Sequence, residues 1–138
     1  MTGDFEKQTV SVTCPFCGQA GHASFGQSVI GSKLRWHRSV ACPVSGAAEE
    51  DGAGGGDVYL RNELLKSNGH WAVRVKGVEK AKSIAMAKRL FSLSNDDASS
   101  LVRSFPNLPI GTKAEADWLV AMLATIAIGG ETVPPHGS

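Results

Sequence analysis

Apolar side chains occupy every second position from Trp71 to Val75, and the intervening Arg74 and the following Lys76 are charged. An alternation with a period of two residues is typical of a strand with one buried face and one exposed face. The pattern therefore predicts a half-buried strand over residues 71–77.

Three segments after this strand repeat apolar residues with the helical spacing of three or four positions. The second of them follows Ser94, a favourable N-cap, and has Asp96 and Asp97 in its first turn. The third is opened by Thr112 and Glu115, which are spaced as a capping box. The apolar positions of the three predicted helices are Ala81, Ile84, Ala87 and Phe91; Ala98, Leu101, Val102 and Phe105; and Trp118, Leu119, Met122, Leu123 and Ile126.

Short apolar segments at Leu108–Ile110 and Thr132–Val133 add two strands to this part of the chain. The order of elements over residues 71–135 is then β-α-α-β-α-β. This order predicts an α+β domain in which three helices cover a three-stranded sheet.

The strongest single motif lies in the N-terminal third of the chain. An alternating segment, residues 5–13, leads to Cys14-Pro15-Phe16-Cys17-Gly18, and Cys42-Pro43-Val44-Ser45-Gly46 repeats this pattern with one serine in place of a cysteine. Two thiolates spaced by two residues on a tight turn can bind one ion, and structural zinc takes four N or S ligands. We therefore predict a structural Zn²⁺ bound by Cys14, Cys17, His37 and Cys42, in a module of residues 1–46. Residues 10–46 resemble small zinc-ribbon and zinc-knuckle modules.

Other interpretations of these cysteines remain open. His22 is the rival fourth ligand, since it lies at C-x₂-C-x₄-H spacing from the first pair. The cysteines could also form a redox pair or be plain buried thiols. No Asp or Glu lies between Cys14 and Cys42, so a catalytic zinc would lack a general base nearby.

A glycine-rich acidic stretch follows, from Ala47 to Asp57, and its composition predicts a flexible linker. Apolar residues at Val58, Leu60 and Leu64 then predict a short helical connector within residues 58–70, with Asp57 as its N-cap. The sequence does not indicate on which unit this connector packs.

The charges nearly balance, with 14 Lys and Arg against 13 Asp and Glu, so the whole chain has no bias towards nucleic acids, membranes or acidic substrates. Locally, the cationic and aromatic segment Lys33, Arg35, Trp36 and Arg38 is a possible nucleic-acid contact. No apolar run approaches the length of a membrane helix and no signal peptide is recognisable, so we expect a soluble, cytoplasmic protein.

The sequence contains no G-x-S-x-G, HExxH, Walker or Rossmann motif. His70 and His136 have no nucleophile or acid at a suitable spacing. We therefore expect a protein that is not an enzyme and has no small-molecule substrate.

The segment from Lys80 to Val133 resembles the C-terminal domain of bacterial ribosomal protein L7/L12. The resemblance depends on Leu93, Ala98, Leu101, Val102, Pro106, Ala116, Leu119, Leu123, Gly129 and Val133. It covers about half of the chain and implies the L7/L12-ClpS-like superfamily fold.

In that family, the helix after the first strand binds translation factors through a lysine, an apolar residue and an arginine. The matching positions here hold Lys80, Ile84 and Lys88, with Arg89 next to them. A second family lysine falls on Ala85. The resemblance thus implies a basic helical face that contacts a protein partner with an acidic surface, possibly a component of the ribosome or of translation.

The leading hypothesis from the sequence is a non-catalytic, zinc-containing adaptor that docks through this helical face. One alternative is a zinc-dependent nucleic-acid-binding regulator. A second is a peptide-binding adaptor similar to the ClpS-type protease adaptors, which share the superfamily fold and have an acidic pocket resembling Asn95-Asp96-Asp97. Because these residues lie at a helix start, we interpret them as a cap.

Overall fold

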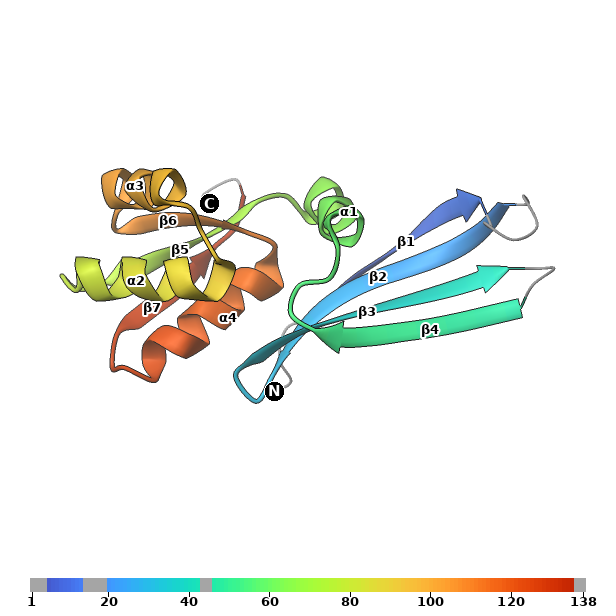
Figure 1. Cartoon of the computed structure of the whole chain (residues 1–138), viewed down its shortest axis with the longest axis horizontal. Coiled ribbons are helices and arrows are strands. Elements are labelled where there is room, and N and C mark those ends of the chain that lie inside the picture. The colour runs from blue at the N-terminus through green and yellow to red at the C-terminus, as the bar shows by residue number, and fades with distance from the viewer. Residues whose placement is uncertain (1–4, 14–19, 43–45, 136–138) are drawn as a thin grey trace. The chain divides into compact units, whose positions relative to one another are not determined.

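The computed structural model describes residues 5–13, 20–42 and 46–135 and divides the chain into two compact units, residues 1–67 and 68–138 (Figure 1). Each unit combines helix with an antiparallel sheet of its own. The predicted α+β class is therefore confirmed. Among the described residues, no helix is long and apolar enough to cross a membrane.

The first unit is a four-stranded antiparallel meander in the order β1-β2-β3-β4, followed by one helix. A two-residue turn joins β2 to β3, and its Gly31 and Ser32 both have positive φ, at 58° and 64°, which suits the twist of a hairpin. The elements are β1 Phe5–Thr13, β2 Ala20–Ile30, β3 Lys33–Cys42, β4 Gly46–Ala53 and α1 Val58–Asn68.

Helix α1 packs on one face of this meander. Its Leu60 and Leu64 are fully buried in one cluster with Ala23 and Phe25 of β2. Asp57 caps the helix, since its Oδ1 accepts a hydrogen bond of 2.8 Å from the Leu60 N–H. The predicted connector helix and its cap are thus confirmed, and the helix belongs to the first unit.

Strands account for most of the region in which a zinc module is predicted, since β2 and β3 are paired over nine residues. One expectation about this unit is wrong. The expected linker over residues 47–57 contains most of β4, which pairs with β3 from Cys42↔Gly46 to Arg35↔Ala53. The boundary between the units therefore lies after Ser67 and not in the glycine-rich run.

Packing around Trp36 explains the composition of that run. A Cβ added to Gly52 would lie 2.8 Å from the Trp36 Nε1 atom, and one added to Gly56 would lie 3.2 Å from the Trp36 Cβ. The glycines allow the indole and the neighbouring backbone to approach closely. These glycines are therefore required for packing around Trp36, although the composition predicted a flexible linker.

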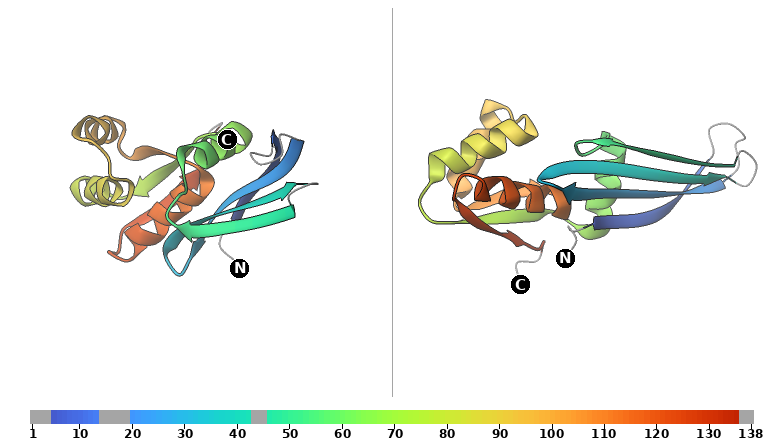
Figure 2. Two further views of the ribbon diagram at one scale, coloured as in Figure 1. Left: turned by 45° about the vertical axis from the view of Figure 1, so that its right-hand side comes forward. Right: turned by 90° about the horizontal axis from the view of Figure 1, so that it is seen from below.

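The second unit has the order β5-α2-α3-β6-α4-β7, as predicted from the sequence. Its antiparallel sheet has the strand order β6-β5-β7, with β5 in the middle (Figures 1 and 2). The elements are β5 Trp71–Lys76, α2 Lys80–Phe91, α3 Asn95–Ser104, β6 Asn107–Gly111, α4 Lys113–Ala124 and β7 Gly129–Val133.

The core of the second unit lies between the helices and one face of the sheet. Val73 and Val75 of β5 are buried there, whereas Arg74 and Lys76 are exposed on the other face, as their alternation predicts. The helices contribute Ile84, Met86, Ala87, Leu101, Ala116, Leu119 and Leu123 to the same cluster. This burial fixes which side of α2 remains available to solvent.

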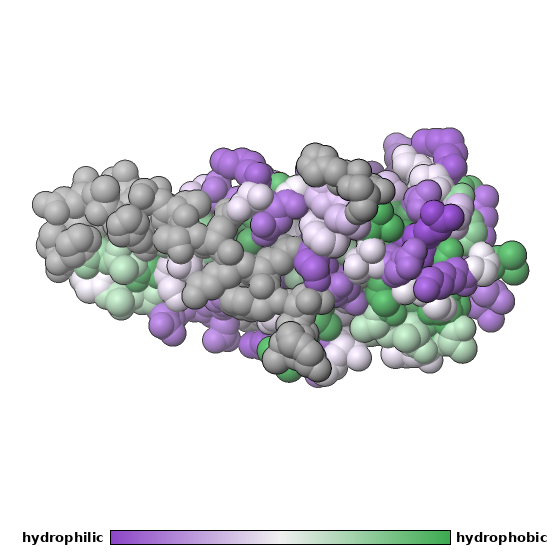
Figure 3. All heavy atoms as spheres, turned by 180° about the vertical axis from the view of Figure 1, so that it is seen from behind, coloured by the Kyte–Doolittle hydropathy of each residue, from purple (hydrophilic) through white to green (hydrophobic). Residues whose placement is uncertain are grey.

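Both predicted helix caps of this unit are present. The Ser94 hydroxyl accepts a hydrogen bond of 3.1 Å from the Asp97 N–H, and Thr112 and Glu115 form a complete capping box. Not every apolar residue is covered: Val78, in the turn before α2, is 90% exposed. Figure 3 shows that hydrophilic residues and smaller hydrophobic areas share the surface of this unit, which occupies the right-hand end of that view.

Candidate functional site

The candidate site is the solvent-exposed side of α2, which we call the basic face. It consists of the exposed cations Lys80, Lys82, Lys88 and Arg89. At 3.6 residues per turn, Lys82 and Arg89 lie on one side of the exposed Ala85, and Lys88 lies on the other. These three cations give the outer side of the helix its positive charge. Lys80, in the first turn, is exposed as well but lies in the same row as the buried Ile84 and Ala87.

Core packing holds this face in position. Ile84, Met86 and Ala87 anchor the opposite side of the helix in the core. At the first turn, the Ser83 hydroxyl donates a hydrogen bond of 2.7 Å to the Glu79 carbonyl. Ile84 is only 7% exposed, so its predicted role in contacting a partner is wrong: it faces the core, as its helical spacing from Ala87 requires.

Two cations of the basic face contact neutral side chains. Lys88 Nζ donates a hydrogen bond of 2.7 Å to Asn95 Oδ1, and Arg89 Nη2 lies 2.9 Å from Met86 Sδ. Within residues 5–13, 20–42 and 46–135, none of the four cations takes part in an ion pair. Elsewhere in the unit, by contrast, Lys113 is paired with Asp117 at 2.9 Å.

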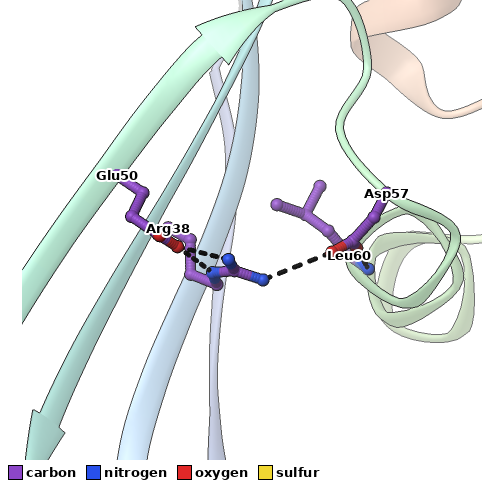
Figure 4. A network of polar contacts seen from close by, with 4 residues as sticks. All are labelled: Arg38, Glu50, Asp57 and Leu60. Atoms are coloured by element: carbon purple, nitrogen blue, oxygen red, sulfur yellow. Dashed lines mark hydrogen bonds and ion pairs between the residues drawn. The ribbon is translucent and has the colours of Figure 1, made fainter.

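The cations of β3 have a different environment (Figure 4). Arg38 forms ion pairs with Glu50 on β4 and with Asp57 at the start of α1, the latter at 3.3 Å. Its guanidinium also lies 5.8 Å from the centre of the Trp36 ring. The hydrogen bonds that Arg38 donates to Glu50 raise the pKa of Arg38 above its ordinary value. Partial burial opposes this rise, and the charges of Glu50 and Asp57 add to it.

The four residues of the possible nucleic-acid contact lie on two opposite faces of β3. Lys33 and Arg35 lie on one face of β3, whereas Trp36 and Arg38 lie on the face that carries α1. Arg35 is paired with Asp51 at 3.2 Å. These four residues therefore do not form one continuous basic surface, and acids on β4 compensate two of their three positive charges.

The acidic residues of β4 were not recognised as partners of these arginines. Glu50 lies directly opposite Arg38 in the register, and Asp51 is diagonal to Arg35. Opposite charges at such positions stabilise neighbouring strands.

Of the four predicted zinc ligands, the structure describes only His37 and Cys42. Cys14 and Cys17 lie outside the described residues. His37 and Cys42 both lie on β3 but five positions apart, so their Cα atoms are separated by about 16 Å. Because ligands of one zinc ion lie within about 4 Å of each other, His37 and Cys42 cannot bind the same ion on this strand.

The register nevertheless brings other candidate ligands near one end of the first sheet. The pairs Thr13↔Ala20 and Cys42↔Gly46 close two hairpins, and β1 and β3 end at the same end of the sheet (Figure 1). The backbone of His22 lies opposite Ala41, next to Cys42. Among the described residues, no group of three or more His, Cys, Asp or Glu side chains is arranged to hold a metal ion.

The acidic motif Asn95-Asp96-Asp97 occupies the first turn of α3. Asp97 donates its backbone N–H to Ser94, and all three side chains are exposed. The motif thus has the position and contacts of a helix cap, and its side chains do not line a buried pocket.

Comparison with known proteins gives no relative for this chain. It matches no protein family, no curated protein and no solved structure.

Proposed function

We propose that this chain is a non-catalytic adaptor whose second unit docks a protein partner through the basic face of α2. The observation that carries the proposal is the group of exposed cations on that face, which has no acidic partner among the described residues. In a chain of net charge +1, such a local concentration of positive charge is a means of orienting one particular partner.

An acidic protein surface is the occupant that this arrangement supports best. The cations lie on one rigid helix, so they can match a fixed constellation of carboxylates. The sequence resemblance to the L7/L12 C-terminal domain adds support for a partner from the translation machinery. Paired arginines on β3 weaken the alternative of nucleic-acid binding.

Reversal of the charges on the basic face tests this function. We expect Lys88→Glu combined with Arg89→Glu to slow association with the partner roughly tenfold, because attraction becomes repulsion along the encounter path. The partner is first isolated from host extract on the immobilised wild-type chain, and its association rate is then measured by surface plasmon resonance.

The matched control combines Lys33→Glu with Arg103→Glu. This variant has the same net charge, but both positions are exposed and lie outside α2. We expect its association rate to stay close to that of the wild type. An equal loss of rate in both variants would mean that net charge, and not the basic face, controls docking.

We further propose that zinc stabilises the first unit through Cys14, Cys17 and Cys42, with His22 as the fourth ligand. Support comes from the repeated Cys-Pro motif and from the register, which places Cys42 and the backbone of His22 near the end at which both hairpins turn. His37 is left out because it lies five positions from Cys42 on the same strand. Three thiolates and one imidazole satisfy the tetrahedral preference of zinc.

Metal content tests this second part of the proposal. Native mass spectrometry should show one bound zinc in the wild type and in His37→Ala, but none in Cys42→Ser or His22→Ala. The reason is that loss of one ligand of four opens a closed tetrahedral site. Retention of zinc by the Cys42→Ser chain would exclude this ligand set.

A further inference from the structure

No strand within residues 5–13, 20–42 and 46–135 pairs with the outer edge of β4. Strand β4 is the last strand of its sheet, and its residues pair with β3 without a bulge. Edge strands are usually protected by charged side chains, above all Lys, by Pro or by a bulge. Strand β4, with the sequence GAAEEDGA, has no Pro, Lys or bulge, and its charged residues are all acidic.

The alternation of hydrogen-bonded and non-hydrogen-bonded pairs between β3 and β4 identifies which backbone groups of β4 point away from β3. The Gly54 N–H donates to the Leu34 carbonyl at 2.8 Å, which makes this a hydrogen-bonded pair. Such pairs alternate with open pairs in an antiparallel ladder. Ala47, Glu49, Asp51 and Ala53 therefore direct their N–H and C=O groups away from β3, towards the free edge.

Charge opposes pairing of this edge with a second copy of itself. In an antiparallel pairing centred on Glu50, Glu50 would face its own counterpart and Glu49 would face Asp51. In the neighbouring register, centred on Glu49, Glu49 would face its counterpart. Like charges directly opposite each other destabilise a strand pair, so both arrangements are disfavoured.

The charge of Glu49 favours an extended segment that carries Lys or Arg. Glu49 is exposed and forms no ion pair among the described residues, whereas Asp51, on the same face two positions further along the strand, is paired with Arg35. The remaining side chains with open backbone groups are alanines, which leave room for an incoming strand. We propose that β4 is a docking edge for a basic, extended polypeptide segment that adds a fifth strand to the first sheet.

A blocked eight-residue peptide in which Lys alternates with Val is a suitable probe, added to the full chain. Backbone amide exchange is followed by NMR. We expect the peptide to slow exchange of the Ala47, Glu49, Asp51 and Ala53 amides, which are free at the edge. The Ala48 and Glu50 amides already bond to β3 and should change little. Binding without this alternating protection would overturn strand addition.

Three variants separate the backbone from the charge contribution. Ala47→Pro removes one outward N–H group without removing a hydrogen bond to β3, and we expect it to weaken binding of the peptide. Glu49→Lys reverses the charge of the edge, and we expect it to weaken binding about tenfold. Glu79→Lys, an equal charge change in the second unit, should leave affinity unchanged. A Lys-Val peptide N-methylated at alternate residues, or a peptide with Glu in place of Lys, should not bind. Equal binding of the Glu peptide would overturn the proposed preference for a basic strand.

Discussion

At the scale of single residues, the two capping motifs show which local signals in the sequence are dependable. Ser94 and Thr112 both accept the hydrogen bond that their spacing predicts. They differ in burial, because Ser94 is exposed whereas Thr112 is fully buried and Glu115 is 4% exposed. Capping depends only on a few neighbouring residues, and for this reason it could be predicted without knowledge of the fold.

We expect Thr112→Ala to lower the free energy of unfolding of the second unit by about 2 kcal/mol, which is the upper end of the range for loss of an N-cap. The cost is high because the buried N–H group loses its acceptor and water cannot replace it. The matched variant Ser94→Ala should cost about 0.5–1 kcal/mol, since water can replace the exposed hydroxyl. Urea titrations read from NMR signals of residues 68–135 give both values. Equal losses would contradict the role of burial.

Side-chain burial divides the predicted partner residues into exposed and buried ones. The resemblance placed Ile84 beside Lys80 and Lys88, but Ile84 lies in the core and only the cations are exposed. Helical spacing alone contained the necessary signal, since Ile84 is three positions before Ala87 of the same apolar stripe. A match of positions to a family motif did not separate buried from exposed residues.

At the scale of whole elements, strands with uninterrupted alternation were predicted and strands with polar interruptions were missed. Strand β5 alternates cleanly from Trp71 to Val75. In β2 and β3 the inward face includes Gln27 and Arg38, which break the apolar pattern. Both have partners that the sequence does not show. Gln27 Nε2 donates a hydrogen bond of 2.8 Å to the Gly55 carbonyl, and Arg38 forms ion pairs with Glu50 and Asp57.

The strand character of β4 leads to a prediction about Gly52. We expect Gly52→Ala to lower the stability of the first unit by about 1–3 kcal/mol, because the added methyl group would lie against the Trp36 indole. Trp36 fluorescence in a background of Trp71→Phe and Trp118→Phe reports unfolding of this unit.

The control for this change is Ala47→Ser, also on β4 but fully solvent-exposed, which should change stability by no more than about 0.5 kcal/mol. In a flexible linker, replacement of one glycine by alanine would be equally harmless. An unchanged midpoint for Gly52→Ala would thus restore the linker interpretation of this stretch.

At the scale of the whole molecule, α1 decides where one unit ends and the other begins. Composition placed the boundary in the glycine-rich run, because linkers and edge strands can share the same small and acidic residues. The contacts of Leu60 and Leu64 with Phe25 join α1 to the first sheet instead. Such a long-range contact has no signature in local sequence.

Truncation of Leu64 tests this assignment. We expect Leu64→Ala to destabilise the first unit by about 2–5 kcal/mol, through lost burial and the cavity left behind, and to leave the second unit unchanged. NMR signals of the two units are followed separately during urea unfolding. Val58→Ala, at a position 74% exposed, is the control and should have little effect. Loss of stability in the second unit would assign α1 there.

The close approach of Gly52 and Gly56 to Trp36 also determines where foreign sequence can enter this chain. A reporter peptide inserted among these glycines would separate the indole from its backbone neighbours and detach the last strand of the sheet. The turn at Gly77 and Val78 is a better point of entry: a Cβ at Gly77 would meet no atom within 4 Å, and Val78 is 90% exposed. A tag placed there would interrupt neither sheet.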